Sequence, residues 1–175
     1  MTNRLMLNKP SSVLVLDLIN YQNRTNLSFS DVSIGIPKPA VVGASPANKN
    51  TSVLLTGTPG TIYDGTANIY YNRLAIDLVF GNKEVGVLDD FNNLSEAVEL
   101  INRDYNLAIS VDEVSAASKN SKGNIVLKIR ESLVYLPNSE IVVMPHSTLL
   151  AFEGVVDRLW YYANFTLFKQ LKGSV

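Results

Sequence analysis

The sequence predicts an α+β fold rich in β-structure, with two helix-plus-β-hairpin units and extended arms. Three observations favour this fold. Two segments carry apolar residues at helical spacing, each is followed by a pair of strand-like runs, and the two helix ends resemble each other. The chain has 175 residues, of which 46% are apolar and 18% charged, so it can bury a core in one domain or two small ones.

The first predicted helix begins at Ser11, in the stretch SSVLVLDLINYQNRTNL. Its apolar residues recur at helical spacing behind two serines, which are common at helix starts. The second predicted helix lies in NLSEAVELINRDYNL. Asn93 is its expected N-cap and Glu96 stands at the capping-box position, so the start of this helix is well defined.

Each helix is followed by a predicted hairpin, in residues 51–71 and in residues 123–143. Gly65 and Pro137 stand where these hairpins turn. Residues 57–60 are predicted to form a bend, because Pro59 fixes φ and the two glycines permit positive φ. Apolar and other residues alternate from Leu74 to Phe80, which predicts that the last strand of the first hairpin continues through this segment.

The two helix ends and the segments after them look alike. DLINYQNRTNLSFSDVS and ELINRDYNLAISVDEVS both open with an acid-Leu-Ile-Asn run and both close near an acid and a Val-Ser pair. Small gaps align them, with Leu27 opposite Leu107 and Ser30 opposite Ser110. An internal duplication and a chance similarity of turn chemistry both explain the likeness.

Under the duplication hypothesis, an α+β domain of residues 1–157 contains two similar halves, residues 11–80 and 92–145. The hypothesis predicts that the halves superpose. The matched positions would be Leu18 with Leu100 and Ile69 with Ile141.

A proline-rich arm is predicted at residues 35–50, GIPKPAVVGASPANKN. Its three prolines exclude a helix or a central strand, because proline lacks the backbone N–H that both need. Long ordered segments of this kind often bind partners. Pro37 and Pro39 are therefore candidate interface residues.

The C-terminal segment, residues 158–175, is unusually aromatic. As a strand it would be apolar on both faces and would need cover on both sides. Two alternatives remain open: these aromatic residues belong to the core of their own chain, or they dock on a neighbouring subunit. The second alternative gives the candidate interface residues Trp160, Tyr161, Tyr162, Phe165 and Phe168.

Composition and motifs argue against several classes of function. The net charge of -1 does not favour nucleic acid, and no apolar run is long enough to span a bilayer. The chain contains no Cys and a single His, His146. The adjacent acids Asp89-Asp90 and Asp112-Glu113 fit a loop before a helix and the first turn of a short helix. We expect no catalytic residue, no metal and no cofactor.

The stretches KNTSVLLTGTPGTIYDGTANIYYNRLAIDLVF and LINRDYNLAISVDEV resemble virion structural proteins of tailed bacteriophages. The resemblance covers residues from Lys49 to Met144. It implies a non-enzymatic component of the capsid, neck, tail or baseplate, located in the virion and assembled in the host cytoplasm. The implied partners are copies of the chain, forming a homo-oligomer, and other virion proteins. No family site residues follow from it.

Two other classes of function are alternatives to the hypothesis of a virion structural protein. One is a carbohydrate- or ligand-binding β module, with Tyr63, Tyr70 and Tyr71 as its stacking platform. The other is a small hydrolase with an unrecognised site.

Overall fold

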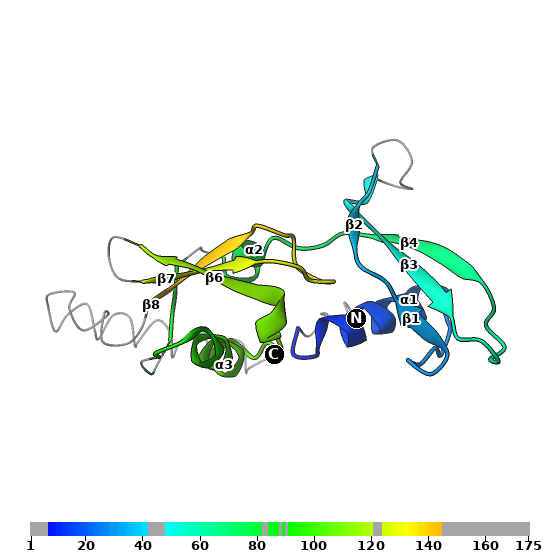
Figure 1. The fold of residues 1–175 in the computed structure, drawn as a ribbon, viewed down its shortest axis with the longest axis horizontal. Helices are drawn as coiled ribbons and strands as arrows, with labels where there is room; N and C mark the ends of the chain where they lie inside the picture. The colour runs from blue at the N-terminus through cyan, green and yellow to red at the C-terminus, as the bar shows by residue number, and fades with distance from the viewer. Residues whose placement is uncertain are drawn as a thin grey trace, which may run out of the picture.

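The computed structural model describes residues 7–41, 48–81, 84–87, 89, 91–120 and 124–144. They form two lobes that lie one after the other along the long axis (Figure 1). The elements of the first lobe are α1 (Ser11–Asn23), β1 (Val32–Ile34), β2 (Lys38–Pro39), β3 (Thr51–Gly57) and β4 (Thr66–Tyr71). Those of the second lobe are α2 (Ile76–Phe80), β5 (Glu84–Gly86), α3 (Leu94–Tyr105), the 3-10 helix η2 (Val111–Glu113), β6 (Val114–Lys119), β7 (Ile125–Ile129) and β8 (Glu140–Met144). The predicted α+β class is confirmed.

Each lobe contains a four-stranded sheet that includes an antiparallel hairpin. In the first lobe β4 pairs with one edge of β3, and β1 and β2 pair in succession with the other edge. In the second lobe the strand order is β5-β8-β7-β6, in which only β5 and β8 run parallel. Both predicted hairpins are therefore present, as β3–β4 and β7–β8.

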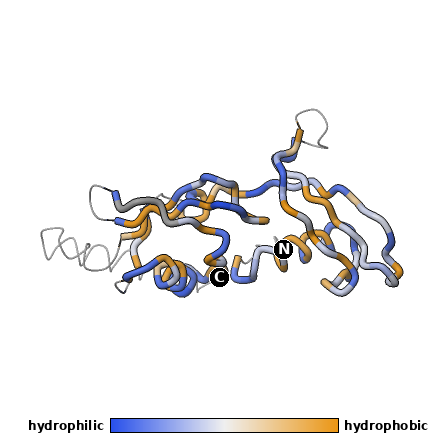
Figure 2. Tube along the Cα trace, in the orientation of Figure 1, coloured by the Kyte–Doolittle hydropathy of each residue, from blue (hydrophilic) through white to orange (hydrophobic). Residues whose placement is uncertain are grey.

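The core lies between the helices and the sheets. Figure 1 shows α1 and α3 on the same side of the two sheets, and Figure 2 shows apolar residues concentrated in the strands and on the helices that face them. Val53 of β3 and Val143 of β8 are buried to 2% and 0% exposure. Buried apolar residues of both lobes form one continuous cluster. None of the helices described is long and apolar enough to cross a bilayer.

The two main helices end in the same hydrogen-bonded arrangement. The side-chain amide of Asn20 donates to the carbonyl of Leu27 at 2.8 Å and accepts the Leu27 N–H at 2.7 Å. Asn102 makes the same pair of bonds with Ile109, at 2.8 and 2.9 Å. One amide thus satisfies a backbone donor and acceptor seven residues later, which ties the following loop to the helix end.

The turns that lead into the sheets are also equivalent. Asp31 accepts the backbone N–H of Ser28 at 2.9 Å, and Glu113 accepts that of Ser110 at 3.1 Å. The second member of every such pair follows the first by 82 positions, as from 28 to 110 and from 31 to 113. The structural correspondence therefore needs no gaps.

The gapped alignment was wrong at two points for this reason: Leu27 corresponds to Ile109 and not to Leu107, and Ser28, not Ser30, corresponds to Ser110. The strand pairing gives a third difference. Val53 lies four residues before the end of β3 and pairs with Ile69, and Ile125 lies four residues before the end of β7 and pairs with Val143. Ile69 therefore corresponds to Val143 and not to the predicted Ile141. The likeness is one of local structure and strand order, and a duplication stays a prediction.

The segment after β4 differs from the expectation. Residues 74–80 do not continue the strand but form a single-residue bridge and then the short helix α2. Strand alternation would place Ile76 and Leu78 on one face, but Ile76 is 1% exposed and Leu78 is 74% exposed. Gly81, with a φ of 71°, ends the helix in the left-handed conformation that glycine adopts without strain.

Replacing Asn20 or Asn102 with Ala should lower the free energy of unfolding by about 1–3 kcal/mol, because two partly buried backbone groups lose their partner. Thermal and urea unfolding measure this. Similar losses are expected from the two sites, since the geometry is the same. Asn26→Ala, at an exposed position in the same loop, is the matched control and should change little. A negligible effect at both helix ends would contradict the role given to these amides.

Candidate functional site

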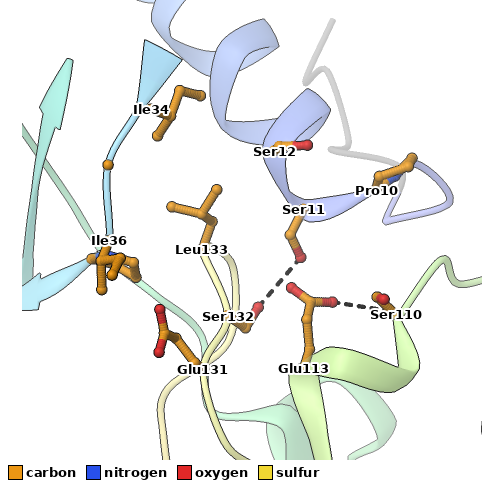
Figure 3. Close-up of a pocket in the computed structure, with 12 residues that line it drawn as sticks. Pro10, Ser11, Ser12, Ile34, Ile36, Ser110, Glu113, Glu131, Ser132 and Leu133 are labelled. Atoms are coloured by element: carbon orange, nitrogen blue, oxygen red, sulfur yellow. Dashed lines mark hydrogen bonds between the residues drawn. The ribbon is translucent and has the colours of Figure 1, made fainter. Parts of the chain in front are cut away.

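A cleft of about 500 Å³ opens between the two lobes. Four segments meet there: the start of α1, the residues joining β1 to β2, the turn of η2, and the β7–β8 connection (Figure 3). Its lining residues are Pro10, Ser11, Ser12, Ile34, Gly35, Ile36, Pro37, Ser110, Glu113, Glu131, Ser132 and Leu133.

Ser132 organises one wall of the cleft. Its hydroxyl oxygen accepts the backbone N–H groups of Val134 and Tyr135, both at 3.1 Å. These bonds occupy its two acceptor positions, so its proton points to the Ser11 hydroxyl, 3.3 Å away. This bond connects the start of α1 to the β7–β8 connection across the boundary between the lobes.

Arg73 lies behind this wall and is only 5% exposed. Its Nε donates to the hydroxyl of Thr51 at 2.9 Å and its Nη1 to the carbonyl of Ser132 at 3.1 Å. Burial lowers the pKa of Arg73, and the nearby Tyr71 and Glu131 act in the opposite direction. The guanidinium thereby joins β3 of the first lobe to the second lobe.

The backbone also joins the lobes beside Arg73. Leu74 donates its N–H to Val134 at 2.9 Å and accepts the N–H of Leu136 at 2.8 Å, which forms a parallel bridge with Tyr135. The β7–β8 connection is therefore held by side-chain and backbone bonds together.

The chemistry that the cleft offers is acidic and apolar. Glu131 is exposed at its rim, and the Glu113 carboxylate also accepts the backbone N–H of Ser110. The sticks in Figure 3 show Leu133 lying between Ile34 and Ile36. This set can receive an apolar or cationic group. The residues described contain no group of three His, Asp or Glu placed to hold a metal ion.

The structure places some of the predicted residues and not others. Pro37 lines the cleft and is half-buried, and Pro39 is exposed in β2 at the sheet edge. Asp112 and Glu113 lie in the first turn of η2, as predicted. The candidate interface residues of the C-terminal segment, together with His146 and Asp90, lie outside the described residues. Asp89 forms an ion pair with Arg103 at 2.7 Å.

The tyrosine platform of the ligand-binding hypothesis is wrong. Tyr70 and Tyr71 are neighbours on β4, so their side chains point to opposite faces of the sheet. Tyr71 is 6% exposed, and burial raises its pKa to about 12. A side chain buried in the core cannot stack on a sugar alongside Tyr70.

Sequence reasoning missed Arg73, Leu74 and Ser132, which hold the lobes together. One signal was present: Arg73 is the sole charged residue in the ten-residue run from Thr66 to Ala75. A lone charge in such a run is a candidate for a buried, hydrogen-bonded role.

Arg73→Ala should reduce the free energy of unfolding by about 3 kcal/mol, because two hydrogen bonds from a charged group are lost and a cavity is left. Chemical denaturation measures this loss. The exposed Arg130→Ala is the matched control and should stay within about 0.5 kcal/mol of the wild type. Equal effects of the two substitutions would contradict the bridging role.

Tyr71→Phe should leave stability at neutral pH unchanged or raised, because the Tyr71 hydroxyl is buried without a partner among the described residues. At high pH the two proteins should differ. The folded-state pKa of Tyr71 is above its unfolded value, so its contribution is complete below pH 10 and is lost as the pH rises through about 12. Denaturation curves measured between pH 9 and 12 should show that the free energy of unfolding falls less for Tyr71→Phe than for the wild type. Equal falls in the two proteins would contradict the buried position of the Tyr71 hydroxyl.

A family model described as a family of unknown function, DUF7941, matches residues 4–151. The chain has no significant match among curated proteins or among solved structures. Because the family model covers most of its length, the chain belongs to the DUF7941 family.

Proposed function

We propose that this chain is a structural subunit of a tailed-bacteriophage virion, which acts by contacts with copies of itself and with other virion proteins. The proposal starts from the resemblance of residues 49–80 and 100–114 to virion structural proteins. One structural observation supports an assembly role in particular, and it concerns the proline-rich arm.

Residues 35–41 of the arm present apolar side chains to solvent while their backbone is held in place. Ile36 is 65% exposed and Val41 is 70% exposed. Gly35 donates its N–H to Leu54 at 2.8 Å, and Ala40 donates to Asn50 at 3.0 Å, so the arm is fastened along the edge of β3. Ordered apolar side chains that no part of their own lobe covers are characteristic of an interaction surface.

Pro37 and Pro39 lie within this arm and belong to the same proposed surface. The second proposed contact is the aromatic C-terminal segment, whose anchors would be Trp160, Tyr161, Tyr162, Phe165 and Phe168. In a symmetric ring each subunit can lend such a segment to its neighbour, so that every copy is covered without an additional partner.

Mass spectrometry of purified virions tests the function directly, together with the native mass of the chain alone and with the products of neighbouring genes. The proposal expects the chain in the particle and in a homo-oligomer or a partner-dependent complex. A chain that is absent from virions, monomeric and able to bind glycans would contradict it and favour the ligand-binding module.

Truncation after Asp157 separates the two roles open to the C-terminal segment. If its aromatic residues are an interface, the shortened chain keeps its melting temperature and its circular dichroism spectrum but no longer assembles. Size-exclusion chromatography with light scattering measures the mass. A shortened chain that unfolds or aggregates would show that these residues belong to its own core.

A further inference from the structure

We propose that the β3–β4 turn, residues 58–65, docks on the second lobe of the next copy. It would repeat between chains the contact that the β7–β8 connection, residues 130–139, makes with the first lobe within a chain. This inference rests on the proposed function and supplies the contact by which copies would join head to tail.

The two connections occupy the same place in their lobes. In each lobe a helix with the Asn side-chain bridge leads through an acidic turn into the strand that pairs with the hairpin. Val32 lies opposite Gly57 and Val114 lies opposite Ile129, which are the last residues of β3 and β7. The β3–β4 turn, which follows β3, is therefore the structural counterpart of the β7–β8 connection, which follows β7.

The connection of the second lobe is a docking element. Ser132, Val134 and Tyr135 are 2%, 9% and 2% exposed, and their neighbours across the boundary are Ser11, Arg73 and Leu74. The contact combines apolar side chains with hydrogen bonds, as stable interfaces do.

The β3–β4 turn carries similar side chains, but in the described structure they are uncovered. Ile62 is 90% exposed, the largest exposure among the large apolar residues described, and Tyr63 beside it is half-buried. Figure 2 shows apolar character at the tip of this turn, at the far end of the first lobe.

The turn is also rigidly built. Gly57 donates its N–H to Gly65 at 2.9 Å, and the Thr61 hydroxyl donates to the Thr58 carbonyl at 2.9 Å. The backbone packs so closely that a Cβ added at Gly57 would lie 2.2 Å from the carbonyl oxygen of Tyr63. A turn held in this way presents Ile62 with little entropy to lose on binding.

The direction of the two turns makes the contact head to tail. Both point toward the same end of the long axis (Figure 1), so a copy placed beyond the first lobe would receive the turn on its second lobe. Such a contact is heterologous and generates rings or filaments.

Within the chain Ser11, at the start of α1, contacts the docking element. The same 82-residue spacing places Asn93, at the start of α3, in the receiving position.

Disulfide trapping tests the contact, because the chain contains no cysteine of its own. In the full chain, Ile62→Cys combined with Asn92→Cys should give a ladder of disulfide-linked dimers, trimers and larger species on non-reducing gels. Asn92 is chosen because Asn93 caps α3. Each single variant should give no ladder. The matched control is Ser11→Cys with Ser132→Cys, whose hydroxyls lie 3.3 Å apart and which should close within one chain.

Native mass measurement gives an independent readout. Ile62→Lys should break the head-to-tail contact and lower the mass of the assembled wild type without changing its melting temperature, because the side chain is exposed. Leu78→Lys, at a second exposed apolar residue, should leave the mass of the assembly unchanged.

Three results would overturn the contact: a monomeric wild type, an Ile62→Lys variant that assembles normally, or dimers formed equally well by Ile62→Cys alone, which would indicate a turn-to-turn contact. These outcomes are distinct from failure of the proposed function. A monomeric chain that is present in virions removes the head-to-tail contact only. A ladder from a chain that is absent from virions supports the contact and removes the virion role.

Discussion

The buried guanidinium of Arg73 is the interaction on which the relative position of the two lobes depends. A charge removed from water is costly unless it is hydrogen-bonded, and here its partners come from opposite sides of the boundary, Thr51 and the carbonyl of Ser132. Moving the second lobe away would take the Ser132 carbonyl from the charge and leave it with only one of these two partners. The next residue, Leu74, is thereby directed into its backbone bridge with Tyr135.

This bridge has consequences for the whole molecule. It holds the β7–β8 connection against the first lobe, and the cleft forms beside that contact with Glu131 at its rim. The residues that fill the boundary in the second lobe have uncovered counterparts at the far end of the first lobe, where Ile62 is exposed. The β7–β8 connection is therefore covered by the first lobe of its own chain, whereas the β3–β4 turn has no such cover. Under the proposed contact, this difference makes the two ends of the chain unequal.

The two lobes share a helix and a three-strand arrangement, but they are completed differently. The second lobe adds β5, which runs parallel to β8, and α2, which lies close to β8. The first lobe has no equivalent of these two elements among the residues described, and the exposed arm around Ile36 follows the edge of its sheet instead. An edge strand with apolar side chains beside it invites another chain, so this asymmetry also favours assembly.

The sequence by itself determined the features whose causes are local. Asn93 accepts the N–H of Glu96 as the capping pattern predicted, and Gly60, though not Gly57, adopts the positive φ that the predicted bend permits. Leu127 and Ile129, two positions apart in β7, are both buried, because period two in a strand separates its faces whatever the partner.

Only the tertiary structure decided the remaining features, because each depends on residues far away in the chain. Residues 76–80 alternate like a strand, but the bridge between Leu74 and Tyr135 ends the sheet pairing and leaves them to form a helix. The sequence pattern placed Tyr71 on the surface, but in the tertiary structure its side chain is buried in the core. The role of Arg73 required Ser132, 59 residues away, since no local pattern specifies which distant carbonyl a buried charge will meet.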